Sequence, residues 1–157
     1  MQHFWLEFIP ALKQKGITLS LDTNWDPEEK WEQVIKILPY VDVFLPNEAE
    51  ARFISGKSDI RDAGKFLAQL CELVVIKCGA DGAIIFMQDQ AHHYLIPSEL
   101  TQNLKIADTT GAGDNFDAGF LSNWLLGKNL EECVNLGIRC GTSSLQAIGG
   151  IEGQLKI

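Results

Sequence analysis

Asp108-Thr109-Thr110-Gly111-Ala112-Gly113-Asp114-Asn115-Phe116-Asp117-Ala118-Gly119-Phe120 is the stretch around which the rest of the chain is organised. It follows a short β-like run, Leu104 to Ala107, and opens a helical pattern that continues to about Gly127. Glycines at a strand-to-helix turn let the backbone approach a ligand closely. The N–H groups of the first helical turn then point at that ligand, and the helix dipole favours negative charge there. The stretch therefore predicts a site for an anion such as phosphate.

Asp114 stands in the same first turn, so a carboxylate lies beside the predicted anion site. This arrangement suggests phosphoryl transfer, in which N–H groups stabilise developing charge and the carboxylate accepts a proton from the attacking hydroxyl. An ordinary capped helix start, with Asp108 or Thr109 as the cap, is the alternative interpretation. A bare Gly-x-Gly-Asp would favour that alternative, but the full run is more specific.

Composition restricts the class of protein. The 157 residues are enough for one domain with a sizeable core, and 46% of them are hydrophobic, as expected for a globular protein. A net charge of −8 argues against a nucleic-acid or anionic-membrane surface. The sequence contains no apolar run of membrane-spanning length and does not begin like a signal peptide. Its four cysteines lack Cys-x-x-Cys spacing, so we expect buried thiols in a reducing cytoplasm.

Strand-like and helix-like segments alternate along the chain, which predicts an α/β sheet, mostly parallel and flanked by helices. The predicted strands are Ile17–Asp22, Val41–Pro46, Leu73–Cys78, Ala83–Met87 and His93–Ile96, the last two as an antiparallel pair. The predicted helices are residues 2–15, a segment capped by Asp26-Pro27 and reaching Leu38, Asn47 to about Ile54, Asp59–Cys71, about 113–126 and 130–147. We find no internal repeat or linker, so a single domain over residues 1–157 is predicted.

Polar residues or glycines follow several predicted strands. Ligands of parallel α/β sheets bind at the carboxyl ends of the strands. We therefore expect the following residues to converge on one edge of the sheet: Asp22, Asn47, Gly79 and Asp108.

The run Asp-Thr-Thr-Gly-Ala-Gly-Asp at residues 108–114 resembles the C-terminal signature of the ribokinase-like, or PfkB, carbohydrate kinases. It is neither the dinucleotide fingerprint Gly-x-Gly-x-x-Gly nor a Walker P-loop. The resemblance implies a ribokinase-like α/β fold and ATP-dependent phosphorylation of a sugar hydroxyl. It also implies that Asp114 is the catalytic base and that Gly111, Ala112 and Gly113 form the anion hole, with Gly113 also contacting the nucleotide.

Asn47-Glu48-Ala49-Glu50 follows a predicted strand and opens a helix. Alone, Glu48 and Glu50 would be first-turn acids that favour the helix dipole. Beside the signature, the spacing resembles the family's Asn-x-x-Glu motif, which organises Mg²⁺, its waters and the triphosphate. The resemblance implies nucleotide-site roles for Asn47 and Glu50, with Glu50 reaching Mg²⁺ through water and Glu48 as a solvated acid.

Lys77-Cys78-Gly79-Ala80-Asp81-Gly82 resembles the family's strand-turn segment that cradles the nucleotide. It implies nucleotide contacts from Lys77, Gly79, Ala80 and Gly82. A hairpin turn with glycines at positive φ is the alternative. Lys77 remains open between reaching a phosphate and lying on the surface.

The run from Ser143 to Gly150 resembles the family's closing segment. In that segment, backbone carbonyls join the first Asp and second Thr of the signature in holding a monovalent cation such as K⁺. The implied residues are Asp108, Thr110, Ser144, Ala147 and Gly149. A helix C-terminus with a glycine cap is the alternative for the last three.

Asp22-Thr23-Asn24-Trp25-Asp26 is similar to the Asp-x-Asn-x-Arg element of several sugar-kinase branches, with Asp26 in place of Arg. A cationic contact to an acidic sugar is therefore not supported, which makes 2-keto sugar acids less favoured substrates.

The resemblance covers essentially the whole chain but only the C-terminal half of the family's usual length. The N-terminal half, with most sugar-binding residues and a small lid, is missing from this sequence. We expect ATP and a sugar as ligands, no nucleic acid and no membrane. We also expect the chain alone to be inactive, and to self-associate or pair with the missing half through an open sheet edge. The alternatives are a nucleoside kinase of the same family, a non-catalytic nucleotide-binding remnant and, more weakly, a dinucleotide-dependent oxidoreductase.

Overall fold

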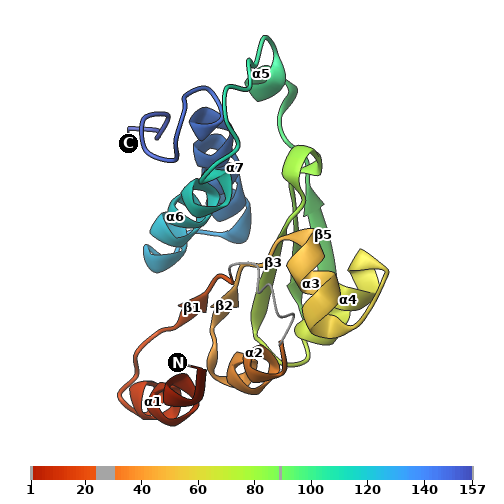
Figure 1. The fold of residues 1–157 in the computed structure, drawn as a ribbon, viewed down its shortest axis with the longest axis vertical. Helices are drawn as coiled ribbons and strands as arrows, with labels where there is room; N and C mark the ends of the chain where they lie inside the picture. Colours follow the sequence, from red (N-terminus) through yellow and green to blue (C-terminus); the bar gives the residue numbers. More distant parts are fainter. Residues whose placement is uncertain (1, 24–30, 89, 157) are drawn as a thin grey trace. The chain divides into compact units, whose positions relative to one another are not determined.

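The computed structural model describes residues 2–23, 31–88 and 90–156. The chain divides into two compact units (Figure 1). The first comprises Met1–Cys78 and Ile84–His93, and the second Gly79–Ala83 and Tyr94–Ile157. A single domain over residues 1–157 stays a prediction, since two compact units can belong to one domain.

One five-stranded sheet follows the order of the sequence, β1-β2-β3-β4-β5. Its strands are β1 (Ser20–Leu21), β2 (Val43–Phe44), β3 (Leu73–Lys77), β4 (Ala83–Met87) and β5 (Gln90–Tyr94). The β1–β2 and β2–β3 pairs are parallel. The connections from β3 to β4 and from β4 to β5 are too short for a parallel crossover, so these strands run antiparallel. The α/β prediction is confirmed, but the sheet is mixed rather than mostly parallel.

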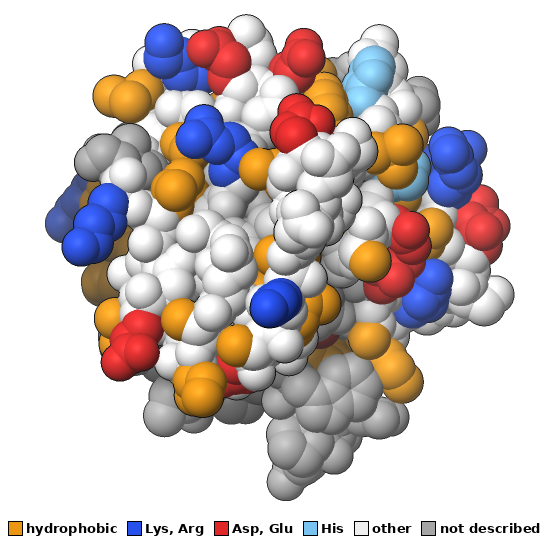
Figure 2. Space-filling model, turned by 90° about the horizontal axis from the view of Figure 1, so that it is seen from above, with side chains coloured by type: hydrophobic (Ala, Val, Ile, Leu, Met, Phe, Trp, Pro, Cys, Tyr) orange, Lys and Arg blue, Asp and Glu red, His pale blue; other side chains and the backbone are white. Residues whose placement is uncertain are grey.

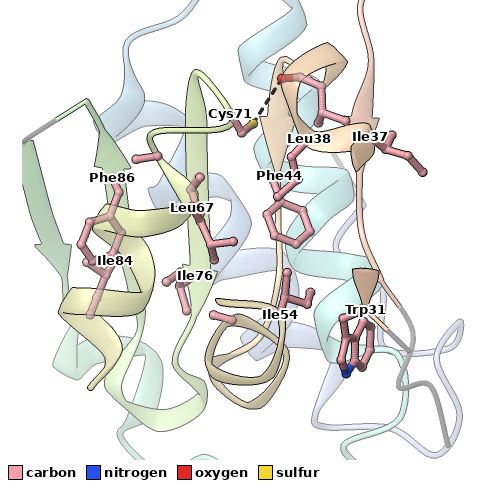
Figure 3. Close-up of a cluster of buried hydrophobic side chains, with 14 of the residues drawn as sticks. Trp31, Ile37, Leu38, Phe44, Ile54, Leu67, Cys71, Ile76, Ile84 and Phe86 are labelled. Carbon is pink, nitrogen blue, oxygen red and sulfur yellow. Dashed lines mark hydrogen bonds between the residues drawn. The ribbon is translucent and has the colours of Figure 1, made fainter. Parts of the chain in front are cut away.

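The core of the first unit lies on a face of this sheet (Figure 3). Phe44, Ile76 and Phe86 come from β2, β3 and β4 and pack with side chains from the helices, such as Ile54 and Leu67. The helices are α2 (Glu32–Ile37), α3 (Glu48–Ser55) and α4 (Ile60–Leu67). Burying each large apolar side chain contributes roughly 1.5–3 kcal/mol. β3 is buried along Leu73–Ile76, as its continuous apolar run predicts for a strand covered on both faces.

The helices of the first unit begin at caps that can be recognised in the sequence. Asn47 caps α3, and Asp59 caps α4 by accepting hydrogen bonds from the backbone N–H groups of Arg61 and Asp62. α4 ends at Leu67, earlier than the predicted Cys71. α1 spans Gln2–Gln14, as predicted, and a 3₁₀ turn, η1, spans Leu38–Tyr40. The predicted Asp26-Pro27 cap, together with Asn24 and Trp25, lies outside the described residues.

The second unit is built on a helical pair. α6 (Ala112–Leu125) and α7 (Leu130–Ser144) pack through side chains that include Phe116, Phe120 and Val134. The Phe116 and Phe120 rings stack at 6.3 Å between centroids. The unit also contains a 3₁₀ turn, η2 (Gly79–Asp81), and a short helix, α5 (Ser98–Thr101).

Around the signature, one local prediction is wrong, and the alternative interpretation with a side-chain cap is not supported. Residues 104–107 form no strand; the N–H groups of Ala107 and Asp108 both donate to the Leu145 carbonyl at the end of α7, at 2.8 and 3.4 Å. Their hydrogen bonds therefore go to a helix end instead of a sheet. The cap of α6 is Gly111, with no side-chain cap, in place of Asp108 or Thr109.

The surface carries mixed charges. On the face in Figure 2, acidic and basic side chains are interspersed with hydrophobic ones. Among the described residues, no helix is long and apolar enough to cross a membrane. All four cysteines are buried free thiols, as predicted.

Candidate active site

The signature turn of the second unit presents backbone donors at the start of α6. Gly111 adopts φ +74°, a left-handed conformation that glycine reaches without steric cost. The Ala112 N–H donates to the Thr109 carbonyl at 3.2 Å, and the Asn115 N–H donates to the Gly111 carbonyl at 2.9 Å. Within the described part of the chain, the N–H groups of Gly113 and Asp114 have no acceptor. These two donors, at the positive end of a 14-residue helix, form an anion-binding geometry.

Asp114 lies at the third position of α6 with an exposed side chain. A carboxylate there is accessible to a substrate hydroxyl and lies next to the unpaired N–H groups. Asp117, one turn further along, is buried, so it faces the packing of α6 and not the solvent beside the turn.

Asp108 is held by donors on both carboxylate oxygens. Its Oδ1 accepts from the Thr110 N–H at 2.9 Å and from the Thr110 hydroxyl at 2.8 Å, and its Oδ2 accepts from the Gly149 N–H at 2.9 Å. The Thr110 N–H, followed by the Gly149 N–H and the Thr110 hydroxyl, lowers the pKa of Asp108 to about 2. The carboxylate is therefore ionised at every physiological pH.

Replacing the Asp108 carboxylate should make the free energy of unfolding depend less on pH in the acidic range. A carboxyl whose pKa is lowered on folding stabilises the protein above its unfolded pKa of about 3.9, and this contribution disappears as the pH falls through the folded pKa. We expect Asp108→Asn to be less stable than the parent chain at pH 7, and the gap to close between about pH 4 and pH 2. Urea unfolding across this range measures it. Thr110→Val, which keeps the backbone donors, should show a smaller gap, and a gap independent of pH would contradict the prediction.

The closing segment meets the signature turn at Gly149. Of the residues predicted to hold a monovalent cation, Asp108, Thr110 and Gly149 are brought together. The Ser144 hydroxyl is turned away and donates to the Gly141 carbonyl of its own helix at 2.8 Å. The Ala147 N–H bonds weakly to the Ser144 carbonyl, at 3.5 Å, as part of the turn that ends α7. The described residues include no group of three or more His, Cys, Asp or Glu side chains that could hold a metal ion.

A second group of predicted residues gathers in the first unit, where β1, β2 and β3 end. Asn47 forms an isolated parallel bridge with Lys77, and the Lys77 N–H donates to the Pro46 carbonyl at 2.9 Å. The Lys77 ammonium pairs with the Asp22 carboxylate at 3.1 Å. We call this group the strand-end cluster: Asp22, Thr23, Asn47, Glu50 and Lys77. The predicted convergence of Asp22 and Asn47 is confirmed; Gly79 and Asp108 belong to the second unit.

The Asn-x-x-Glu spacing forms a capping box at the start of α3. The Asn47 N–H donates to Glu50 Oε2 at 2.9 Å, and the Glu50 N–H donates to Asn47 Oδ1 at 3.0 Å. Glu48 is different, since it pairs with Arg52 one turn along at 3.3 Å. Asn47 and Glu50 therefore have a local structural role, and any metal contact would add to it.

Glu50 is a buried carboxyl, 3% exposed, in a charged neighbourhood. Its pKa is raised mainly by burial, and the Asp22 charge acts in the same direction. The Asn47 N–H, the Lys77 ammonium and the Thr23 hydroxyl oppose the shift. A bound cation would relieve the cost of ionising Glu50 in this environment.

Of the two open expectations for Lys77, the surface position is wrong and the phosphate contact stays a prediction. Its side chain is only 13% exposed, so it does not lie on the surface, and its ammonium is paired with Asp22. A phosphate contact from Lys77 would have to share or replace this ion pair.

The turn after β3 has the geometry of a hairpin turn with glycines at positive φ, which is the alternative to a nucleotide-binding segment. Gly79 and Gly82 adopt φ +55° and +84°, as expected for glycines in a tight turn. A side chain on Gly82 would collide with the Tyr94 carbonyl, so packing alone requires glycine there. Ala80 is exposed at the tip. Nucleotide contacts from Gly79, Ala80 and Gly82 stay a prediction.

Sequence reasoning missed Asn115 and Thr23. Asn115 is 7% exposed, and its amide bonds two backbone carbonyls of the second unit. One of these carbonyls lies 35 residues further along the chain, which no local spacing reveals. Thr23 is part of a sequence motif but was not predicted as a site residue; its hydroxyl lowers the pKa of Glu50.

The fold places the chain among ribokinase-like α/β proteins. The ribokinase of Arabidopsis thaliana, solved with ribose and ATP, superposes with a TM-score of 0.81 at 25% identity over 98% of this chain and 49% of that structure. The family model described as "pfkB family carbohydrate kinase" matches residues 3–157. The chain therefore belongs to the pfkB family of carbohydrate kinases, whose members are ATP-dependent phosphotransferases.

Curated relatives act on different acceptors. A cytidine kinase of Thermococcus kodakarensis is 31% identical over 92% of this chain and 52% of its own length. A 2-dehydro-3-deoxygluconokinase of Haemophilus influenzae is 31% identical over 98% of this chain and 51% of its own length. The chain thus spans about half the length of the curated relatives it matches.

Proposed function

We propose that this chain carries the catalytic base and part of the nucleotide site of an ATP-dependent kinase that phosphorylates a sugar hydroxyl. The observation that carries the proposal is the start of α6, where the N–H groups of Gly113 and Asp114 are unpaired in the described chain beside an exposed carboxylate. The N–H groups would stabilise the phosphoryl oxygens, and the Asp114 carboxylate would accept the proton of the attacking hydroxyl.

Asn47 and Glu50 are proposed to organise Mg²⁺ and its waters. Glu50 is buried and engaged in the capping box, which favours contact with Mg²⁺ through water over direct ligation. One carboxylate, waters and substrate phosphates are a usual environment for Mg²⁺. Asp108, Thr110 and Gly149 are proposed to lie beside a monovalent cation, with the backbone carbonyls of Ser144 and Ala147 as further candidate ligands. A cytoplasmic location also stays a prediction.

A nucleoside kinase is the second candidate, because a cytidine kinase is among the relatives. The residue that makes a sugar acid less favoured, Asp26, lies outside the described part of the chain, so sugar acids belong in the test as well.

The test is phosphoryl transfer from ATP·Mg²⁺ on a panel of neutral sugars, 2-keto sugar acids and nucleosides, using the native gene product. Phosphorylation of a sugar supports the proposal, and phosphorylation of nucleosides alone favours the second candidate. Binding of ATP without turnover on any acceptor would support a non-catalytic remnant. Binding of NAD without ATP would contradict all three.

Self-association, or pairing with a chain that supplies the other half of the relatives' length, is also proposed. β1 is the first strand of the sheet and pairs only with β2 among the described strands. Trp5, Phe8 and Ile17, which precede β1, are 42–44% exposed. Open strand edges and exposed apolar side chains favour association. Sedimentation of the chain alone should show a species larger than a monomer, weakened by Phe8→Glu. A monomeric 157-residue chain with full kinase activity would rule the proposal out.

A further inference from the structure

The closing segment of the second unit lies directly on the signature turn. The Gly149 N–H donates to Asp108 Oδ2 at 2.9 Å. A methyl group on Gly111 would lie 2.8 Å from the Cα of Gly150, so the two backbones are in contact. The turn that carries the anion-binding N–H groups therefore depends on a segment distant in the sequence.

Asn115 bonds both sides of this contact. Its side-chain nitrogen donates to the Gly111 carbonyl at 2.8 Å and to the Gly150 carbonyl at 3.0 Å. A side-chain amide nitrogen has two hydrogens, which matches two carbonyl acceptors. The Asn115 backbone N–H also donates to the Gly111 carbonyl, at 2.9 Å. The Gly111 carbonyl thus accepts hydrogen bonds from the backbone N–H and from the side-chain amide of one buried residue, Asn115.

The direction of the Gly111 carbonyl decides where the turn points. This carbonyl belongs to the peptide unit that also carries the Ala112 N–H, because peptide units are planar. The N–H groups of Gly113 and Asp114, which have no acceptor among the described residues, follow on the next two residues. A rotated Gly111 peptide would redirect the start of α6 and the donors that it presents.

We propose that Asn115 is a positioning residue that holds the Gly111 peptide and the Gly149–Gly150 segment together, and thereby keeps the start of α6 in its anion-binding conformation. This inference rests on the proposed function only in taking ATP as the ligand. The hydrogen bonds of Asn115 are observed independently of that function. Asp108 supports the same contact, because its carboxylate accepts a hydrogen bond from Gly149 while the Asn115 amide donates one to Gly150.

The chemistry of the position is specific. Alanine would leave the half-buried Gly150 carbonyl without its closer donor, since Gln154 reaches it only at 3.5 Å. Aspartate, of equal size, would place a carboxylate against two carbonyl oxygens when ionised. Protonated aspartate regains one O–H donor, so its effect must depend on pH.

The experiment compares the parent chain with Asn115→Ala, Asn115→Asp and the control Phe120→Leu. Phe120 is fully buried on the same helix, and its side chain has no group that could hydrogen-bond to the signature turn. Affinity for ATP·Mg²⁺ is measured by calorimetry well below the melting temperature of each variant. Amide hydrogen exchange is followed at Gly149, whose N–H is bonded across the contact.

We expect both Asn115 variants to bind ATP about tenfold more weakly than the parent chain. The deficit of Asn115→Asp relative to the parent chain should shrink as the pH falls from 7 to 5, while that of Asn115→Ala should not change. Exchange at Gly149 should be faster in both. Phe120→Leu should lower the melting temperature without changing ATP affinity or Gly149 exchange.

The outcomes separate this inference from the proposed function. If the parent chain binds ATP and both Asn115 variants bind it equally well, the positioning role is overturned. If affinity falls equally in Phe120→Leu, Asn115 is merely structural and the inference is also overturned. If the parent chain does not bind ATP, the proposed function fails, and Gly149 exchange alone decides whether Asn115 holds the contact.

Discussion

Asp114→Asn should lower the rate of ATP-dependent phosphorylation by about 10²–10⁴-fold in the native gene product. The asparagine amide has the size of the carboxylate but cannot accept the proton that the attacking hydroxyl loses. The side chain is exposed in the first turn of α6, so the substitution leaves no cavity and no buried unpaired group. ATP affinity should be unchanged or slightly higher, because a negative charge next to the phosphates is removed.

Asp62→Asn is the matched control. Asp62 occupies the same third position at the start of α4, is also exposed, and lies in the first unit. It should leave turnover unchanged. Steady-state rates and ATP titrations on both variants give the comparison. Equal turnover in Asp114→Asn and the parent protein would exclude Asp114 as the base, and equal loss in both variants would point to a general effect of charge.

Gly111→Ala should be the most destabilising single change in the signature turn. A left-handed backbone costs a residue with a Cβ roughly 1–2 kcal/mol. The added methyl group would also lie 2.8 Å from the Cα of Gly150, and backbone atoms cannot move aside as a flexible side chain can. Such overpacking costs roughly a further 1–3 kcal/mol. We expect a combined loss of about 2–5 kcal/mol, which lowers the melting temperature by roughly 5–15 °C in a chain of this size.

Gly127→Ala separates the two contributions. Gly127 has a similar φ, +71°, but no atom within 4 Å of the position of an added methyl group. Gly127→Ala should therefore lower the free energy of unfolding only by the roughly 1–2 kcal/mol that a left-handed backbone costs, and ATP affinity should not change. Thermal melts and ATP titrations measure both. A Gly111→Ala variant no less stable than Gly127→Ala would mean that the closing segment moves away from the turn at little cost.

Features that depend on neighbours in the sequence could be predicted well. The Asn47–Glu50 spacing predicts the start of α3 because a capping box joins residues three apart. The apolar run at Leu73–Ile76 predicts a strand buried on both faces. The signature at 108–114 predicts the family, because its glycines and Asp114 lie together in one turn, and the match over residues 3–157 confirms this prediction. Nothing in these patterns tests the catalytic assignment itself, which stays a proposal.

Features that depend on distant partners required the tertiary structure. Residues 104–107 have a strand-like pattern, but their hydrogen bonds go to Leu145, which no local pattern encodes. The antiparallel arrangement of β4 and β5 could be predicted from their short connection, but the pairing of β3 with β4, which makes the sheet mixed, was not predicted. The position of Lys77 could not be predicted because its partner, Asp22, follows a different strand.

The sequence by itself determined the family, the alternation of helices and strands, and the turn that presents Asp114, because each is specified within a few residues of chain. The tertiary structure alone decided what holds that turn in place. Asn115 and Asp108 bond the Gly149–Gly150 segment there, and spacing along the chain cannot reveal such long-range hydrogen bonds because their partners are 35 and 41 residues apart.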